Sequence, residues 1–341
     1  MDLEDFDYAL PPSAIAQAPA VPRDAARLLL IDRSRQAVED HRFTELPDLL
    51  RAGDCMVVND SRVIPARVIA AATDGRPAEL LFLEARDAGR WTALVKPGRR
   101  CRPGAELRVG SARLRVIAEE EDGARLVERL DGTIEALMLT HGRPPLPPYI
   151  TRHAAPTALD AERYQTVYAR DPGSVAAPTA GLHFTSELLA RLRRRGVDIH
   201  ALTLHVGPAT FRPIRVARVE EHRLPPERML VPRVAADAVN RARTDGRRVV
   251  AVGTTATRAL EGSVGADGRV REQAGAVNLF ITPGHRFRAV DAMVTNFHLP
   301  RSSLLVLVSA FAGRALILKA YAHAIDAGYR FYSYGDACLI V

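Results

Sequence analysis

Residues 78–130 read AELLFLEARDAGRWTALVKPGRRCRPGAELRVGSARLRVIAEEEDGARLVERL, and this stretch decides the expected fold. Apolar and polar residues alternate in short runs, which are separated by turn pairs such as Pro97-Gly98 and Asp122-Gly123. Alternation places every second side chain on one face of a strand, and such dipeptides form tight turns between strands. The run TIEALML (133–139) shows a similar texture. We therefore expect a small antiparallel β-barrel or sandwich over residues 67–149.

The sequence on both sides of this region alternates between strand-like and helix-like segments. RRVVAV (247–252) predicts a buried strand that ends at Gly253, and a helix-like segment follows it. Further helices are expected at 186–195, in the apolar run capped by Ser302, and at 314–327. The predicted fold class is therefore α/β, with a mixed sheet in the main domain and an inserted small antiparallel β-barrel domain. The predicted limits are 1–66 plus 150–341 for the main domain and 67–149 for the inserted domain.

Composition limits the class of protein. The chain has 341 residues, of which 47% are hydrophobic and 26% charged, so it can bury a sizeable core and is not expected to be disordered. It contains no run of about 18 apolar residues, and its N-terminus, MDLEDFDYALPP, lacks the layout of a secretion signal. We expect a soluble cytoplasmic protein with no membrane segment. A monomer is expected because no heptad pattern or apolar interface stripe is present.

Charge leaves nucleic-acid binding open. Basic residues outnumber acidic ones by 47 to 40, a net charge of +7, which permits an acidic partner such as RNA. Only Lys96 and Lys319 are lysines, however, so a codon bias toward arginine is an equally good explanation. The sharpest cluster is KPGRRCR on a loop of the β-rich region, and we expect it to contact RNA phosphates. Its basic residues are Lys96, Arg99, Arg100 and Arg102.

Several common site motifs are absent. The sequence has no P-loop and no G-x-G-x-x-G after a strand, which disfavours a Rossmann nucleotide site. It has no G-x-S-x-G elbow, which disfavours a serine hydrolase. The histidines lack metal-ligand spacing with cysteine support, and three dispersed cysteines make neither a disulfide framework nor a zinc knuckle. No metal site is expected.

Polar residues follow several of the predicted strands. NDSRVIPAR places polar groups at a strand-to-loop transition, where they can converge on a ligand; a turn closed by Asn and Asp side chains is the alternative. His205 ends a strand-like run, the usual position of an active-site group in α/β proteins. Thr254 and Thr255 lie at a strand-to-helix turn that can bind a carboxylate or phosphate. The candidates in NDSRVIPAR are Asn59, Asp60, Arg62 and Arg67.

Three further stretches carry candidate groups. Small residues around Ser174, Thr179 and Gly181 form a loop before a helix, where backbone N–H groups can bind an anion. His183 lies in the same loop, and a structural, hydrogen-bonded histidine is the alternative. In TNFHLP, Asn296, Phe297 and His298 can stack on and hydrogen-bond a base, or form an ordinary helix cap with an aromatic staple. Asp336 follows three aromatic rings, which suit either a flat ligand or a packed C-terminal strand.

Six motifs resemble those of the S-adenosylmethionine:tRNA ribosyltransferase-isomerase family, a family of queuosine biosynthesis proteins. They occur in the family's order: NDSRVIPAR, GSVAAPTAGLHF, HVG-x-x-TF, VGTT, TNFHLP and YRFYSYGDA. The resemblance runs from Phe6 to Ile340. It implies an α/β domain with an inserted β-barrel, no metal, and a transferase and isomerase that modifies tRNA.

The resemblance also implies a specific reaction. Members of the family transfer the ribosyl part of S-adenosylmethionine, a co-substrate, to the aminomethyl group of preQ1 at the tRNA wobble position. The ribose rearranges to give epoxyqueuosine-tRNA, and adenine and methionine are released. This reaction needs acids and bases that work near neutral pH, because a proton must leave C5′ beside the sulfonium and adenine must depart. We expect His183, His205 and His298 to face the site, with Asp60, Glu221 and Asp336 as partners.

The remaining candidates are expected to bind the substrates. Thr254 and Thr255 are expected to hold the methionine carboxylate, and Arg62, Arg67 and the Lys96–Arg102 loop to meet tRNA. Three positions depart from the family's usual residues, and any catalytic role for them is in doubt. They are Ala209 in place of a glycine, Pro225 in place of a histidine and Asn278 in place of an acidic residue. A non-catalytic tRNA-binding protein and an RNA methyltransferase are the alternatives, although the missing Rossmann loop counts against the second.

Overall fold

The computed structural model describes residues 1–87, 89–152, 155–207 and 214–341. The chain folds into two compact units. One unit contains Met1–Arg62, Gln165–Asp171 and Ala177–Val341, and the other contains Val63–Tyr164 and Pro172–Ala176. The predicted domain limits at 66/67 and 149/150 remain a prediction.

The larger unit is built on a mixed sheet with the strand order β15-β13-β12-β3-β14-β16-β17-β1-β2. Its strands are β1 (Arg27–Asp32), β2 (Ala37–Arg42), β3 (Cys55–Asn59), β12 (Asp198–Leu204), β13 (Glu227–Val231), β14 (Val249–Val252), β15 (Gln273–Val277), β16 (Ala292–Asn296) and β17 (Ala337–Ile340). The central strands β12, β3, β14 and β16 run parallel, and β17 runs antiparallel to β16. Strands β3, β14 and β16 are buried along their whole length, as expected for strands covered on both faces.

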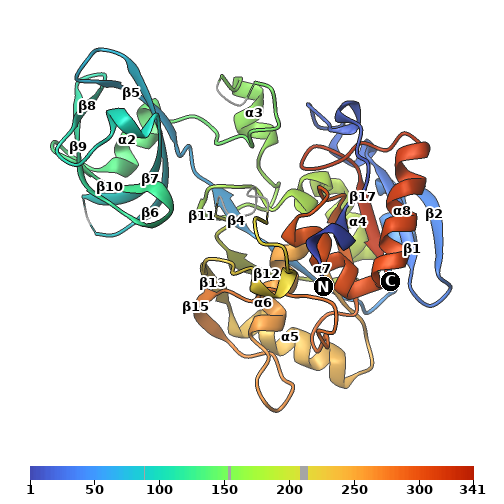
Figure 1. The fold of residues 1–341 in the computed structure, drawn as a ribbon. Helices are drawn as coiled ribbons and strands as arrows, with labels where there is room; N and C mark the ends of the chain where they lie inside the picture. The colour runs from blue at the N-terminus through green and yellow to red at the C-terminus, as the bar shows by residue number, and fades with distance from the viewer. Residues whose placement is uncertain (88, 153–154, 208–213) are drawn as a thin grey trace. The chain divides into compact units, whose positions relative to one another are not determined.

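Helices cover both faces of this sheet (Figure 1). They are α1 (Leu46–Leu49), α4 (Ser186–Arg194), α5 (Arg233–Thr244), α6 (Gly253–Gly262), α7 (Ser303–Ala312) and α8 (Arg314–Asp326). Leucines of α4 pack against Met56 and Val58, which alternate along β3 with residues that face the other side of the sheet. Helices α5 and α6 contact β12, β3 and β14.

The helix ends follow the sequence rules. The side chain of Ser302 accepts a hydrogen bond from the backbone N–H of Leu305 and so caps α7. The chain leaves α4 through Gly196 in the left-handed region, with φ of 83°. Four helices and the strand before α6 therefore occupy the segments where the sequence predicts them.

The smaller unit contains a closed antiparallel barrel with the strand order β10-β7-β6-β5-β8-β9, labelled in Figure 1. Its strands are β5 (Arg67–Ala72), β6 (Pro77–Ala85), β7 (Arg90–Lys96), β8 (Glu106–Val109), β9 (Ala112–Glu119) and β10 (Ala124–Arg129). Alternate side chains such as Leu80, Phe82, Leu114 and Val116 fill the interior. The predicted fold class, an α/β mixed sheet with an inserted small antiparallel β-barrel, is confirmed.

The reading of TIEALML as a strand-like run is wrong. This segment begins the helix α2 (Ile134–His141), and the side chain of Thr133 accepts a hydrogen bond from the N–H of Ala136 at its start. Ile134, Leu137 and Met138 are buried at helical rather than strand spacing, and they pack into the barrel core. The remaining short elements are β4 (Ser61–Val63), α3 (Ala158–Arg163) and β11 (Asp171–Ser174).

Candidate functional site

The carboxyl-terminal ends of four parallel strands gather most of the predicted polar residues at one edge of the large sheet. Asn59 ends β3, His205 follows β12, Thr254 and Thr255 follow β14, and Asn296 ends β16. The 3-10 helix η7 (Thr179–His183) contacts both β16 and α6, so it lies against the same edge. Ligands of open α/β sheets bind outside the carboxyl ends of the strands, and this edge is therefore the candidate site.

The Asn59 side chain ties three of these elements together. It is fully buried, and its Nδ2 donates to the Leu204 carbonyl at 2.9 Å and to the Thr255 Oγ1 at 3.3 Å. Its Oδ1 accepts hydrogen bonds from the backbone N–H groups of Ser61 and Leu204. With donor and acceptor both engaged, Asn59 fixes the relative position of β3, β12 and the start of α6.

Asp60 is a buried carboxylate with a charged partner. It is 3% exposed, accepts a hydrogen bond from the Thr203 Oγ1 at 2.7 Å, and lies 2.9 Å from the Arg170 Nη2. The Tyr168 ring also lies near it: burial raises the pKa of Tyr168, and the negative charge of Asp60 raises it further. The Tyr168 hydroxyl is buried and has no hydrogen-bond partner among the described residues. Asp60 thus holds the negative charge on this side of the site.

His183 is a neutral histidine. It is 4% exposed, and its ring packs on Phe43 with 5.0 Å between the centroids. Burial lowers its pKa to about 4, although Asp336 opposes the shift. Its Nε2 lies 3.1 Å from the Asn296 Nδ2, which can only donate, so Nε2 accepts and the ring proton is on Nδ1. His183 therefore presents an N–H donor on its other nitrogen.

Asn296 offers a free acceptor beside His183. Its Nδ2 also donates to the Tyr332 carbonyl at 3.2 Å, which fixes the orientation of the amide. The Oδ1 is then buried without a hydrogen-bond partner among the described residues, although Asn296 is only 3% exposed. A buried acceptor of this kind costs stability unless a ligand satisfies it. The pair can therefore receive a ligand edge that has both a donor and an acceptor.

His205 carries a free ring nitrogen in a half-buried position. Its backbone N–H donates to the Arg228 carbonyl at 2.9 Å, which continues the pairing of β12 with β13. Its Nδ1 is buried without a hydrogen-bond partner among the described residues. Burial lowers its pKa below the usual value, and the charge of Arg228 lowers it further. His205 is thus neutral at pH 7 and free to accept a proton.

Thr254 and Thr255 lie in the first turn of α6. They are 6% and 8% exposed, and the preceding Gly253 has φ of 90°, which favours glycine. A Cβ at Gly253 would lie 3.6 Å from the Cβ of Ala180, so η7 passes close to this turn. The backbone N–H groups of a first turn have no partner within the helix and attract anions.

Phe297 and His298 are packed in the protein core. Phe297 is fully buried among Tyr321, Tyr329 and Phe331, so its faces are already covered. His298 is 5% exposed, its Nε2 lies 2.9 Å from the Thr295 Oγ1, and burial lowers its pKa to about 3. These contacts anchor the segment that follows Asn296.

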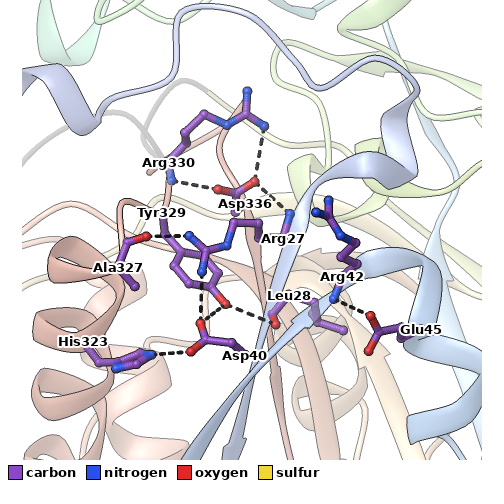
Figure 2. Close-up of polar contacts among 10 residues, drawn as sticks. All are labelled: Arg27, Leu28, Asp40, Arg42, Glu45, His323, Ala327, Tyr329, Arg330 and Asp336. Atoms are coloured by element: carbon purple, nitrogen blue, oxygen red, sulfur yellow. Dashed lines mark hydrogen bonds and ion pairs between the residues drawn. The ribbon is translucent and has the colours of Figure 1, made fainter.

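Asp336 joins the starts of β1 and β17, which meet at the same edge (Figure 2). Its carboxylate accepts hydrogen bonds from the backbone N–H of Arg27 at 3.0 Å, the backbone N–H of Arg330 at 2.8 Å and the Arg330 Nη2 at 3.2 Å. The Arg27 guanidinium lies over the Tyr329 ring, 3.7 Å from its centroid, and pairs with Asp40. Asp336 therefore holds the backbone beside His183 and contributes negative charge to it.

The other site candidates lie in different surroundings. Gly181 packs so closely that an added Cβ would lie 2.1 Å from the Tyr168 hydroxyl. Glu221 and Arg62 are exposed, and Thr179 is half-buried in η7. The structure does not bring Glu221 into the polar contacts of His183 or His205. Ser174 is buried and belongs to the smaller unit.

The basic loop belongs to the barrel unit. Lys96, Arg99 and Arg102 are exposed, whereas Arg100 donates to the Pro77 carbonyl at 2.9 Å and pairs with Asp74. Arg67, in contrast, is 6% exposed and pairs with Glu79 inside the same unit, so its charge is already engaged.

Arg258 and Glu227 form a buried ion pair that the site predictions omitted. The signal was present, because Arg258 is the one charged residue in VGTTATR and follows Thr254 by one helical turn.

Three positions depart from the family's usual residues. Of these, Pro225 and Asn278 are exposed, and Ala209 lies outside the described residues together with Thr210 and Phe211.

The two buried histidines predict acid sensitivity. In the unfolded chain they protonate near pH 6.5, whereas their folded pKa values are about 4 and about 3. Their contribution to stability is complete above pH 6.5 and is lost as the pH falls toward those values. Between pH 7 and pH 5 we expect a loss of roughly 2 kcal/mol for each histidine, measured by urea unfolding. The double variant His183→Asn/His298→Gln should show a flatter pH dependence; an unchanged dependence would contradict this.

The described residues contain no group of three or more His, Cys, Asp or Glu side chains placed to hold a metal ion. Within the same ranges, no single helix is long and apolar enough to cross a membrane, and α7 and α8, which together have the length and composition, are bent by 114°.

Comparisons with known proteins cover the whole chain. Residues 3–340 match a family model described as "Queuosine biosynthesis protein". The S-adenosylmethionine:tRNA ribosyltransferase-isomerase of Desulfitobacterium hafniense is 49% identical over 100% of both chains. That of Anaeromyxobacter dehalogenans is 52% identical over 100% of this chain and 99% of its own. A crystal structure of S-adenosylmethionine tRNA ribosyltransferase from Thermotoga maritima is 36% identical, with a TM-score of 0.57, and the match covers 99% of this chain and 100% of that one.

Proposed function

The chain belongs to the queuosine biosynthesis protein family, and on this basis we propose that it is an S-adenosylmethionine:tRNA ribosyltransferase-isomerase. It transfers the ribosyl part of S-adenosylmethionine to the aminomethyl group of preQ1 at the tRNA wobble position and isomerises it. The products are epoxyqueuosine-tRNA, adenine and methionine. The observation that carries this proposal is the full-length identity of about one half to relatives of that name.

The chemistry sets three tasks for the site. The sulfonium acidifies the hydrogens on C5′, so a base must remove one of them. Adenine must leave C1′, which is easier when its ring nitrogens receive hydrogen bonds. The amine of preQ1 must be neutral to act as a nucleophile. Each task needs groups near neutral pH in a site that excludes water.

We assign the base to His205. A general base must be deprotonated at the working pH and have a free lone pair within reach of the proton. His205 has a lowered pKa, and its Nδ1, just after the end of β12, has no hydrogen-bond partner among the described residues. Asp60 accepts a hydrogen bond from the Thr203 Oγ1 near the end of β12, and it supplies negative charge on the same side of the site.

We assign recognition of the leaving adenine to His183 and Asn296. The Asn296 Oδ1 is a free acceptor that suits the exocyclic amine of adenine, and the His183 Nδ1–H is a donor that suits a ring nitrogen. His298 and Asp336 act in this scheme by holding Asn296 and His183 in place. Phe297 contributes through the aromatic core behind them.

The other predicted residues keep their proposed places in the substrate site. Thr254 and Thr255 present a helix N-terminus to the methionine carboxylate of S-adenosylmethionine, and Asn59 positions them. The small-residue loop contributes close backbone approach, whereas Glu221 is exposed and we assign it no acid–base role. The loop residues are Ser174, Thr179 and Gly181. Arg62, which is exposed, is kept as a tRNA-facing residue, whereas Arg67 is buried and paired with Glu79 and is not assigned to tRNA.

We propose that Lys96, Arg99 and Arg102 contact tRNA phosphates, with Arg100 supporting the loop. Reversing the three exposed charges to glutamate should weaken tRNA binding. It should also make the negative slope of log K against log salt concentration shallower by about 2, because each phosphate contact contributes roughly 0.7–0.9 to the steepness of that slope. The measurement is filter binding over a range of salt concentrations. Arg193→Glu/Arg194→Glu on α4 is the control, and an equal effect per reversed charge in the two sets would refute the assignment.

Label transfer tests the reaction itself. With S-adenosylmethionine labelled in the ribose, the label should move to tRNA, whereas a label in the methyl group should leave with methionine. A methyl label retained on RNA would indicate a methyltransferase. Tight tRNA binding without any use of S-adenosylmethionine would indicate a non-catalytic binding protein. We further propose that the enzyme acts in the cytoplasm and that it is a monomer. Light scattering after size exclusion measures the molar mass and so tests the second statement.

A further inference from the structure

Arg258 has a hydrogen-bonding arm that none of the described residues uses. It is 5% exposed; its Nε donates to the Leu279 carbonyl at 3.0 Å, and its Nη1 donates to Glu227. Its Nη2 is buried without a partner among the described residues. Unsatisfied donors on a buried guanidinium cost stability, so a ligand acceptor at this point explains why the arrangement persists.

The free arm borders a pocket. The pocket is partly open to solvent, and its lining includes Arg258, Glu227, Ser303 and the apolar side chains of Leu304, Leu307 and Phe280. Its enclosed part is narrow, with room for little more than a water molecule. The enclosed part therefore admits one small polar group such as a carboxylate, and the rest of the ligand lies in the open part.

The groups around the pocket select the charge of that end. Ser303 begins the ten-residue helix α7, whose first turn adds backbone N–H donors and partial positive charge. Together with the Arg258 arm they favour a carboxylate. One Glu227 oxygen accepts from the Gly207 N–H at 3.0 Å and the other accepts from Arg258. Each oxygen has a second lone pair, which a nearby ammonium group can use. This combination suits the zwitterionic end of an α-amino acid.

The pocket adjoins the candidate site. Arg258 lies one turn after Thr254 on α6, so the two side chains project from the same face of the helix. Glu227 begins β13, which pairs antiparallel with β12 and therefore starts where β12 ends, near His205. A ligand at the strand ends can reach the pocket with one extended arm.

We propose that Arg258 binds the carboxylate of the methionine part of S-adenosylmethionine, with Glu227 facing its ammonium group and Ser303 completing the subsite. This proposal rests on the proposed function, because it takes S-adenosylmethionine as the ligand. It places the charged partner of the carboxylate one helical turn beyond the Thr254 and Thr255 pair.

Calorimetry with two ligands tests the proposal. The wild-type protein should bind S-adenosylmethionine about 10- to 100-fold more tightly than its decarboxylated form, which lacks only the carboxylate. Arg258→Met should remove most of this preference while leaving affinity for the decarboxylated ligand nearly unchanged. Equal affinities in the wild type, or an unchanged preference in a folded Arg258→Met variant, would overturn the proposal.

Two further variants separate binding from folding. Arg258→Lys keeps Glu227 paired but lacks the second arm, so it should fold and still lose much of the preference. Arg248 also pairs with a buried carboxylate, Asp54, at the opposite edge of the sheet, and Arg248→Met should lose stability without changing the preference. Adenine release without a carboxylate preference would refute the subsite alone, whereas a carboxylate preference without adenine release would refute the proposed function alone.

Discussion

Replacing His183 with alanine should lower the rate of adenine release by about 10³-fold while the protein remains folded. The substitution removes the Nδ1–H donor and leaves the Asn296 Nδ2 without the ring nitrogen that now accepts from it. The lost packing against Phe43 should cost roughly 2–4 kcal/mol, less than the stability of a typical native protein. Adenine is measured by chromatography, and folding by circular dichroism.

Two amide variants locate the effect on one ring nitrogen. An asparagine at position 183 can place a donor near the position of Nδ1, whereas a glutamine reaches the position of Nε2. We therefore expect His183→Asn to retain more activity than His183→Gln, although both fill part of the cavity. Full activity in His183→Ala, or the reverse order of the two amides, would contradict the assignment.

Replacing His205 with alanine should reduce kcat/KM by about 10²- to 10⁴-fold, because the proposed base is lost. In the wild type the same residue should produce the acidic limb of the pH–rate profile. Its pKa is lowered by burial and by Arg228, so the limb should lie below the usual histidine value of about 6.5. Activity should fall as the pH drops through that lower value, because the base becomes protonated.

His200 provides a matched control on the same strand. It lies in β12 toward the amino-terminal end and pairs with Asp198 at 2.8 Å, away from the strand-end site. His200→Ala should change kcat/KM by less than a factor of a few and leave the acidic limb in place. An acidic limb that survives in His205→Ala would show that another group is the base.

The sequence was most informative at the ends of apolar runs. A polar residue directly after a buried strand is easy to recognise, and topology brings such positions together without any knowledge of side-chain contacts. Asn59, His205, Thr254 and Asn296 were found in this way, and they meet at one edge. Turn pairs and alternation were similarly sufficient for the barrel.

The sequence was least informative where the partner of a side chain is distant. Nothing local distinguishes Arg67, which is paired inside the barrel unit, from Arg99, which is exposed. Phe297 was proposed to stack on a base, but aromatic residues from 24 or more positions later cover it. Arg258 was not predicted as a site residue, because its importance depends on an ion pair with Glu227, which lies 31 positions earlier on another element.

The spacing of apolar residues alone also gave the wrong prediction for α2. Short apolar runs fit a strand or a buried helix equally well, and residues 133–139 contain an N-cap threonine that decides between them. The strand-like runs that precede these residues favoured a strand, and the N-cap threonine was therefore given too little weight. A capping residue therefore deserves more weight than the texture of the surrounding segment.

The most direct test of the proposed ribosyl transfer is product analysis with purified protein, S-adenosylmethionine and tRNA carrying preQ1. We predict that free adenine and methionine appear together, in equal amounts, with a heavier nucleoside at the wobble position, and that tRNA without preQ1 yields none of them. If authentic preQ1-tRNA and correctly folded protein give no adenine and no change in the wobble nucleoside, the proposed activity is wrong, and a tRNA-binding role without catalysis takes its place.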